Sequence, residues 1–207
     1  MSQHQITTED ELRALMGAPV HELVLVKSSA FLTEPMKSYI ELSPFVCLAT
    51  HGEDGTGDVS PRGDAPGFVL ALDDKTLVIP DRPGNKRLDS IVNIINQPNL
   101  ALLFMIPGIS ETLRVNGKGF ISTDPELLER FEVSGKLPSL VIVVTVEEAF
   151  GHCSKAFRRS KLWQQAYVPT AKVPSLSELM SDHLQLDQDT TTMLEAAIED
   201  DAQNNMY

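Results

Sequence analysis

The residues best suited to chemistry lie in one short stretch, residues 79–90, where Pro and Gly residues are mixed with three basic side chains. The apolar run at residues 76–79 predicts a strand, and apolar residues at helical spacing predict a helix over residues 88–95. A turn that leads from a strand into a helix N-terminus binds anions well, because unpaired backbone N–H groups and the helix dipole point the same way. We therefore expect a phosphate at this turn, with a solvated loop of ordinary surface charge as the alternative.

The composition is that of an ordinary globular protein. The chain has 207 residues, of which 42% are hydrophobic and 22% are charged, and these values suit one domain of moderate size. It contains no apolar run near the ~20 residues that span a bilayer, and its first residues lack the features of a signal peptide. The two cysteines, Cys47 and Cys153, lie far apart, which argues against a disulfide framework and a thiolate zinc site. We expect a cytoplasmic protein with no metal site.

Charge is unevenly distributed along the chain. The net charge of −12 disfavours nucleic acid as a partner, and we expect no membrane partner either. From Glu178 onward there are eight acidic residues and no Lys or Arg, so all 17 basic residues lie before that point. A basic pocket for a small anionic ligand is therefore compatible with an acidic protein.

Short apolar runs predict a mostly β protein. Seven strands are predicted, at residues 45–50, 58–62, 68–72, 76–80, 99–106, 112–122 and 139–146. Helices are predicted around them, at residues 7–16, 35–42, 88–95, 124–131, 152–163, 175–184 and 189–200. Six or seven strands with one helix between the fourth and the fifth favour a closed antiparallel barrel over a doubly wound sheet.

Three regions follow from this pattern. Residues 1–44 form an N-terminal helical segment, residues 45–165 the barrel domain, and residues 166–207 an acidic C-terminal helical extension. A linker with two prolines is predicted at residues 164–174. The apolar residues of the extension favour packed helices over a disordered acidic tail.

Five motifs carry a family resemblance. They are residues 60–68 (SPRGDAPGF), 79–90 (IPDRPGNKRLDS), 103–108 (LFMIPG), 111–117 (ETLRVNG) and 152–163, which contains HCSKA and RSKLW. In this order and spacing they resemble the pyridoxamine 5′-phosphate oxidase-related, FMN-binding split-barrel flavoproteins, over roughly residues 7–165. The resemblance implies a mainly β (α+β) fold, a six-stranded antiparallel Greek-key split barrel with flanking helices. It also implies a homodimer with FMN at the subunit interface.

The resemblance assigns FMN-binding roles to the turn after the fourth strand. The residues carried over to the phosphate are Asn85, Lys86 and Arg87 in the turn and Arg62 on the neighbouring strand. The residues beside the flavin ring, which offer backbone groups, are Ile79, Pro80 and Asp81. Arg82 is the remaining basic candidate in the stretch. A phosphate carries about −1.5 to −2 charges, and Arg binds it as a fork and Lys as a point charge. The helix N-terminal amides at residues 86–88 are expected to complete the site.

Further candidates lie outside this turn. The strand from Thr112 to Arg114 is expected to approach the flavin of the partner subunit. In the basic segment, Lys155 either belongs to a solvated helix face or reaches the cofactor, and Ser160 caps the helix or binds the phosphate. Trp163 either anchors the core or an interface, or stacks on the flavin.

Some motifs allow more than one interpretation. Asp64 is expected to fix Arg62 or another basic group, with a structural ion pair as the alternative. His152 is expected to line the flavin pocket, with a metal or haem ligand as the alternative. Its neighbour Cys153 is poorly placed as a nucleophile partner, because adjacent helix residues point about 100° apart.

The sequence also departs from the oxidase proper. The oxidase carries an Arg-Met-Val-Leu-Leu-Lys run before the phosphate turn, whereas this chain has residues 60–64, Ser-Pro-Arg-Gly-Asp. The oxidase's Arg and His that hold its substrate have no clear counterpart. The predicted function is therefore an FMN-dependent oxidoreductase with an unknown small-molecule substrate and NAD(P)H as a candidate reductant. No catalytic residue is assigned. The alternatives are a non-catalytic flavin-binding or sensor protein, and haem or deazaflavin binding on the same barrel.

Overall fold

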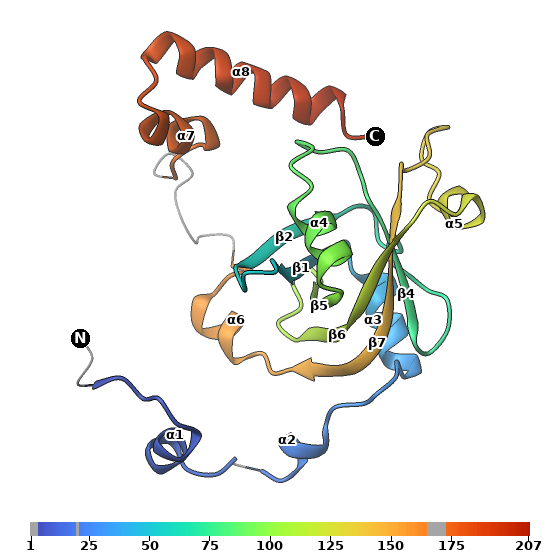
Figure 1. The fold of residues 1–207 in the computed structure, drawn as a ribbon, viewed down its shortest axis with the longest axis vertical. Coiled ribbons are helices and arrows are strands. Elements are labelled where there is room, and N and C mark those ends of the chain that lie inside the picture. The colour runs from blue at the N-terminus through green and yellow to red at the C-terminus, as the bar shows by residue number, and fades with distance from the viewer. Residues whose placement is uncertain (1–3, 20, 165–172) are drawn as a thin grey trace.

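A computed structural model describes residues 4–19, 21–164 and 173–207. Its centre is a seven-stranded antiparallel sheet with the strand order β2-β1-β5-β6-β7-β4-β3 (Figure 1). The strands are β1 (Phe45–His51), β2 (Gly57–Gly63), β3 (Leu70–Ala71), β4 (Thr76–Pro80), β5 (Asn99–Met105), β6 (Thr112–Ser122) and β7 (Val141–His152). The mainly antiparallel fold with flanking helices is confirmed. The sheet has seven strands instead of six because the two-residue β3 extends its edge.

One apolar core lies inside the curved sheet. Side chains from β1, β4, β5, β6 and β7 form a single buried cluster, so strands from distant positions in the sheet share one interior. Strands β2 and β3 end the pairing order, so the barrel is split and not closed in the described residues. Edge strand β2 contains Pro61, which pairs with Cys47 of β1. A proline fits there because an edge strand leaves one side of its ladder unpaired.

The two longest strands, β6 and β7, join the halves of the sheet. In β6, Leu113 and Val115 are buried whereas Lys118 and Phe120 are exposed, which confirms the predicted alternation. Strand β7 runs to His152, beyond the predicted end at residue 146. A bulge lies at Gly117, where a Cβ atom would come within 2.1 Å of the Thr145 carbonyl oxygen. Glycine therefore permits the close approach of these strands.

Eight helices surround the described part of the sheet. They are α1 (Glu9–Met16), α2 (Leu23–Val26), α3 (Glu34–Leu42), α4 (Asp89–Asn96), α5 (Pro125–Glu129), α6 (Lys155–Ser160), α7 (Leu176–Leu184) and α8 (Gln188–Asn204). Helix α1 begins with a capping box of Thr8 and Glu11, as the Thr and Glu residues predict. Helices α1 and α2 bury no side chain, and α7 packs on α8. The predicted linker lies mostly outside the described residues.

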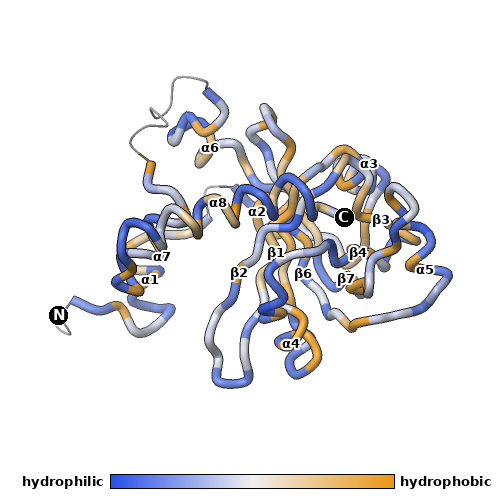
Figure 2. The backbone as a smooth tube through the Cα atoms, turned by 90° about the horizontal axis from the view of Figure 1, so that it is seen from above, coloured by the Kyte–Doolittle hydropathy of each residue, from blue (hydrophilic) through white to orange (hydrophobic). Residues whose placement is uncertain are grey.

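Helix α4 is the helix inserted between β4 and β5. It packs on β1, β2 and β6 and buries Ser90, Ile91 and Ile94. The helix predicted from the apolar spacing is present, but two of its apolar side chains, Val92 and Ile95, point outward and are at least half exposed. Figure 2 shows α4 as a strongly hydrophobic segment on the outside of the molecule. The helix therefore carries apolar side chains on two faces, of which the sheet covers one.

None of the described helices is both long and apolar enough to cross a membrane.

Candidate functional site

A cavity of about 870 Å³ lies where β4 leads into α4. We call it the turn cavity, and its walls are residues 58–63 of β2, Phe68, residues 80–91, residues 136–140 and Tyr207. Seven of the predicted cofactor residues line it: Arg62, Pro80, Asp81, Arg82, Asn85, Lys86 and Arg87. The fold thus brings together residues from two strands and one turn around one cavity. Ile79 does not line the cavity, because its side chain is fully buried in the core.

The turn itself has an unusual backbone. Lys86 and Leu88 adopt positive φ angles of 57° and 62°, a left-handed conformation that costs roughly 1–2 kcal/mol for a residue with a Cβ atom. The Asn85 side-chain oxygen accepts a hydrogen bond of 3.0 Å from the Arg87 backbone N–H. Backbone strain of this kind concentrates at ligand-binding and catalytic sites.

The start of α4 differs by a few residues from the prediction. The helix begins at Asp89, so residues 86–88 lie in the turn and do not provide helix N-terminal amides. Leu88 is the N-cap residue and makes no side-chain capping bond. The first-turn amides of the helix, which begin at Asp89, therefore lack the side-chain acceptor that usually caps them. The turn cavity is lined by this same first turn.

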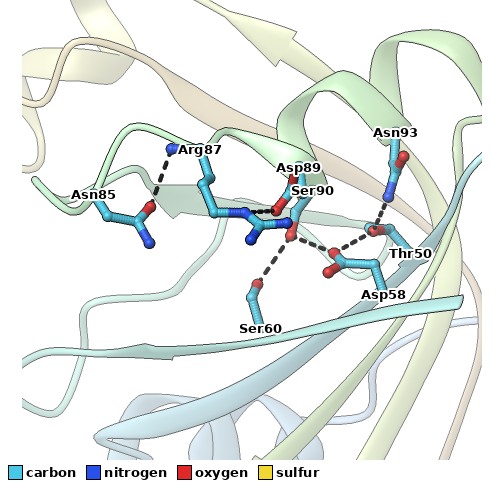
Figure 3. Close-up of polar contacts among 8 residues, drawn as sticks. All are labelled: Thr50, Asp58, Ser60, Asn85, Arg87, Asp89, Ser90 and Asn93. Carbon is cyan, nitrogen blue, oxygen red and sulfur yellow. Dashed lines mark hydrogen bonds and ion pairs between the residues drawn. The ribbon is translucent and has the colours of Figure 1, made fainter. Parts of the chain in front are cut away.

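Two basic side chains of the turn are accessible. Arg87 is 76% exposed and forms an ion pair of 2.7 Å with Asp89 (Figure 3). Lys86 is exposed and forms no ion pair with the described residues. Exposed ion pairs contribute only about 0–1 kcal/mol. Both cations can therefore turn toward an anion at small cost.

Arg62 and Arg82 are held more firmly. Arg62 Nη1 lies 2.5 Å from Asp81 Oδ1, and both side chains are largely buried. Arg82 Nε donates to Asp64 Oδ2 at 2.7 Å, and its Nη1 donates to the Phe131 carbonyl at 2.8 Å. Asp64 therefore fixes Arg82 and not Arg62. Two of the donor nitrogens of Arg82 are occupied by the protein, which gives this residue a structural role in the cavity wall.

The pKa of Asp64 reflects this environment. Burial raises the pKa, but hydrogen bonds from Tyr207, Ala65 and Arg82, together with the Arg82 charge, outweigh burial and hold the pKa below its usual range. Asp64 is therefore ionised at neutral pH and binds the arginine as a charged partner.

A polar network lies beneath the turn, and sequence reasoning missed most of it (Figure 3). Asp58 Oδ2 accepts hydrogen bonds from Ser90 Oγ at 2.7 Å and from Thr50 Oγ1 at 2.9 Å. Ser60 Oγ lies 3.0 Å from Ser90 Oγ, and Asn93 donates to Thr50. Because Ser90 gives its single hydroxyl hydrogen to Asp58, Ser60 must be the donor to Ser90.

A signal for part of this network exists in the sequence. Asp58, Ser60 and Arg62 occupy alternate positions of β2, and all three are half-buried while the residues between them are exposed. The period of two in a strand places them on one face. The hydroxyl groups of Ser90 and Thr50 bind Asp58, and Ser60 joins the network through Ser90.

Thr112, Arg114 and His152 belong to a separate group that does not line the turn cavity. Arg114 lies over the Phe150 ring at 4.5 Å, and Lys27 lies over the same ring at 4.6 Å. Arg114 Nε is buried and has no hydrogen-bond partner among the described residues. Thr112 is buried and pairs with His152 at the start of β6. We call Lys27, Thr112, Arg114, Phe150 and His152 the Arg114 cluster.

The environment of the Arg114 cluster lowers the pKa of His152. Burial lowers the pKa of His152, and the nearby charges of Lys27 and Arg114 lower it further. His152 is therefore neutral at pH 7. The cluster offers two cations and a neutral imidazole beside an aromatic ring.

The candidates near α6 are engaged locally. Ser160 Oγ donates to the Phe157 carbonyl of its own helix at 3.1 Å. Trp163 stacks on Phe157 with ring centroids 5.5 Å apart, and its Nε1 donates to the Ile109 carbonyl at 2.8 Å. Lys155 is exposed. Ser160 and Trp163 therefore make their contacts around α6 and its end, and none of these three residues lines the turn cavity.

Two residues of the cavity wall, Lys136 and Tyr207, carry no local motif and were not predicted. Both reach the cavity from distant parts of the sequence. Among the described residues, no group of three His, Cys, Asp or Glu side chains is arranged to hold a metal ion.

Solved structures provide one comparison. HupZ from Group A Streptococcus is 20% identical and covers 58% of this chain and 93% of its own, with a TM-score of 0.48. General stress protein 26 from Bacillus anthracis is 17% identical, covering 55% of this chain and 88% of its own, with a TM-score of 0.43. An FMN-binding protein from Syntrophomonas wolfei is 12% identical, covering 56% of this chain and 83% of its own, with a TM-score of 0.44. A search of curated proteins finds no significant match.

The sequence itself matches a family model described as pyridoxamine 5′-phosphate oxidase. The match runs from residue 32 to residue 153, which is more than half of the chain. It includes every strand of the sheet and the turn cavity except for residue 207. The family expected from the five motifs is confirmed, and the chain belongs to the pyridoxamine 5′-phosphate oxidase family, with its flavin-binding fold.

Proposed function

We propose that this chain binds FMN in the turn cavity and acts as an FMN-dependent oxidoreductase. The observation that carries the proposal is a cavity of about 870 Å³ that ends at a basic turn and an uncapped helix N-terminus. Its volume lies within the roughly 300–1,000 Å³ of small-molecule sites. Family membership favours a flavin as the ligand.

The donor groups of the cavity fit a phosphate. Lys86 offers a point charge, and Arg87 offers a planar fork whose ion-pair partner among the described residues is the exposed Asp89. The first-turn amides of α4 supply neutral donors along the helix dipole. Two wall carboxylates already have partners of their own, because Asp81 forms an ion pair with Arg62 and Asp58 accepts hydrogen bonds from two hydroxyl groups. An incoming phosphate would therefore displace Asp89 from Arg87 and leave the other pairs intact.

A homodimer would complete the site. The Arg114 cluster and Trp163 do not line the turn cavity of their own chain. We propose that a second copy brings them to the flavin, as in the arrangement that the family resemblance implies. One feature favours contact with a second copy: the outer face of α4 is apolar and exposed.

FMN, when bound, supplies the electron transfer, and the protein supplies position and electrostatics. The wall carboxylates Asp58 and Asp81 are engaged by donors, so we assign no proton transfer to either of them. The residues of this chain therefore bind and orient, and a small-molecule substrate and a reductant such as NAD(P)H would stack on the exposed flavin face.

The absorption spectrum of the purified protein is the first test. We expect flavin absorption bands at about 370 and 450 nm, and we expect the flavin to stay bound during gel filtration. A haem Soret band, or a single deazaflavin band at about 420 nm, would overturn the assignment of FMN. Reduction of the bound flavin by NAD(P)H should be faster than reduction of free FMN. Equal rates would support the non-catalytic flavin-binding alternative.

A further inference from the structure

Tyr207 forms part of the wall of the turn cavity, although it follows α8 at the other end of the sequence. Its hydroxyl group donates to Asp64 Oδ1 at 2.7 Å, and its ring faces the Arg82 guanidinium at 5.4 Å. Lys136 Nζ donates to the main-chain oxygen of Tyr207 at 2.6 Å. Figure 1 shows the end of α8 beside the loop that joins β4 to α4. Asp64 and Arg82 thus contact the side chain of Tyr207, and Lys136 contacts its main chain.

The acceptor of the tyrosine is well suited to this contact. Asp64 uses Oδ2 for Arg82 and Oδ1 for Tyr207, and its side chain is 5% exposed. The hydrogen bond to Asp64 raises the pKa of Tyr207, so the hydroxyl stays protonated and remains a donor. A neutral phenol that donates to a buried carboxylate makes a strong, directed contact.

The rest of residues 173–207 is loosely attached. Helix α8 buries no side chain, and α7 buries only Ser177 and Ser181. Ser181 bonds to Thr191 of α8, so it holds the two helices together. Among the described residues, the hydrogen bonds that join this segment to the sheet domain are those of Tyr207. Tyr207 is therefore its anchor.

Hydrogen bonds at the end of α8 fix the backbone shortly before Tyr207. Asn205 donates its backbone N–H to the Asp201 carbonyl and its side-chain amide to the Asp201 carboxylate, both at 3.0 Å. This pair of bonds extends the helical order to Asn205, two residues before Tyr207. The strap, which we define as residues 205–207, is therefore short and fixed at one end. The cavity keeps its volume of about 870 Å³ with Tyr207 in place, so the side chain borders the cavity and does not fill it.

We propose that the strap closes the turn cavity over bound FMN, with Tyr207 as a binding-site residue that slows FMN release. This inference rests on the proposed function. Tyr207 borders the turn cavity without filling it, so FMN can bind while Tyr207 is in place. When the contacts of Tyr207 with the sheet domain break, the strap opens and FMN can leave.

The release rate of FMN tests the strap. The FMN-loaded protein is diluted rapidly, and the rise of free-flavin fluorescence is followed. Tyr207→Ala should raise the release rate about tenfold. Tyr207→Phe, which keeps the ring against Arg82 and loses the bond to Asp64, should raise it about threefold. Tyr39→Phe is the matched control, because Tyr39 donates its hydroxyl to the Glu111 carbonyl away from the cavity. If Tyr207→Ala released FMN at a rate within twofold of the wild-type rate, the proposal that the strap slows FMN release would be wrong.

A second measurement does not depend on FMN. The full chain is labelled with 3-fluorotyrosine, and its ¹⁹F spectrum is recorded without ligand, with Tyr207→Phe identifying the Tyr207 line. If Tyr207 is docked, its ¹⁹F line should be displaced from that of free fluorotyrosine. If the two lines coincide, Tyr207 is not docked and the strap proposal is wrong. If the wild-type protein binds no FMN, the proposed function fails while this spectrum still decides the docking. If FMN binds and leaves at a rate independent of Tyr207, only the strap fails.

Discussion

The turn cavity and the Arg114 cluster are two basic regions of one chain, and they differ in completeness. The turn cavity has a volume of about 870 Å³, a strained turn, and two exposed cations, Lys86 and Arg87, that can turn toward an anion at small cost. The Arg114 cluster does not share that volume, and it holds a buried guanidinium nitrogen without a partner among the described residues. The turn cavity is formed within one chain and should bind FMN by itself. The Arg114 cluster does not line that cavity and should contribute to FMN binding only when a second copy of the chain is present.

The largest expected effect lies in the turn. The double variant Lys86→Ala/Arg87→Ala should weaken FMN binding by about 1.5–3 kcal/mol per residue, as for charged hydrogen bonds, which amounts to at least about 100-fold in Kd. Flavin fluorescence titration measures this change. Lys118→Ala is the matched control, because Lys118 is an exposed cation paired with Glu147 on β7. Equal retention of FMN by the double variant and the control would contradict the phosphate assignment.

The second effect separates structure from binding within the same cavity. Arg82→Ala leaves the buried Asp64 carboxylate without its ionic partner, which should lower the free energy of unfolding by about 3 kcal/mol. Urea denaturation monitors the change. Arg87→Ala is the control, since its exposed pair contributes about 0–1 kcal/mol. Equal stability of the two variants would contradict the structural role given to Arg82.

The same pair predicts a pH dependence. Because the pKa of Asp64 is lowered in the folded state, its contribution to stability is present above the unfolded pKa of about 3.9 and is lost as pH falls through the folded value. Below about pH 4 the wild type should therefore lose stability faster than Asp64→Asn. Parallel acid denaturation curves would count against a charged Asp64–Arg82 pair.

A smaller effect is expected from the Arg114 cluster. Arg114→Ala should weaken FMN binding by about 1 kcal/mol, and only at protein concentrations where the dimer forms. Sizing by analytical ultracentrifugation with flavin absorbance tests both parts. A stable monomer that retains FMN with full affinity would remove the cluster from the site.

The smallest effect belongs to α6. The Ser160 hydroxyl is already bonded within its own helix, so Ser160→Ala should change the Kd for FMN by less than about twofold. A larger change would show that the end of α6 reaches the phosphate, and it would make the two regions one continuous site.

The turn was predictable because its signals are local. Prolines, a glycine, basic residues and a helical repeat all fall within residues 79–90, and each acts through the backbone of its neighbours. The strand boundaries of β4 and β6 follow for the same reason. The apolar spacing predicts the helix but not its buried face, because tertiary packing on β1 and β6 selects Ile91 and Ile94 over Val92 and Ile95.

Long-range contacts were beyond a single sequence. Asp64 sits near Arg62 in the chain, yet its partner is Arg82, which only the fold could select. Lys136 and Tyr207 reach the cavity from segments separated from the turn by dozens of residues, and neither belongs to a motif. Alternation in β2 did contain a usable signal for Asp58 and Ser60.

The most direct test compares FMN with riboflavin, which differ only in the phosphate. If the basic turn grips the phosphate, the wild type should bind FMN at least about 100-fold more tightly than riboflavin, and Lys86→Ala/Arg87→Ala should reduce this ratio to within about tenfold. Isothermal titration of both ligands gives the ratio. A wild-type protein that binds the two flavins equally would contradict the account.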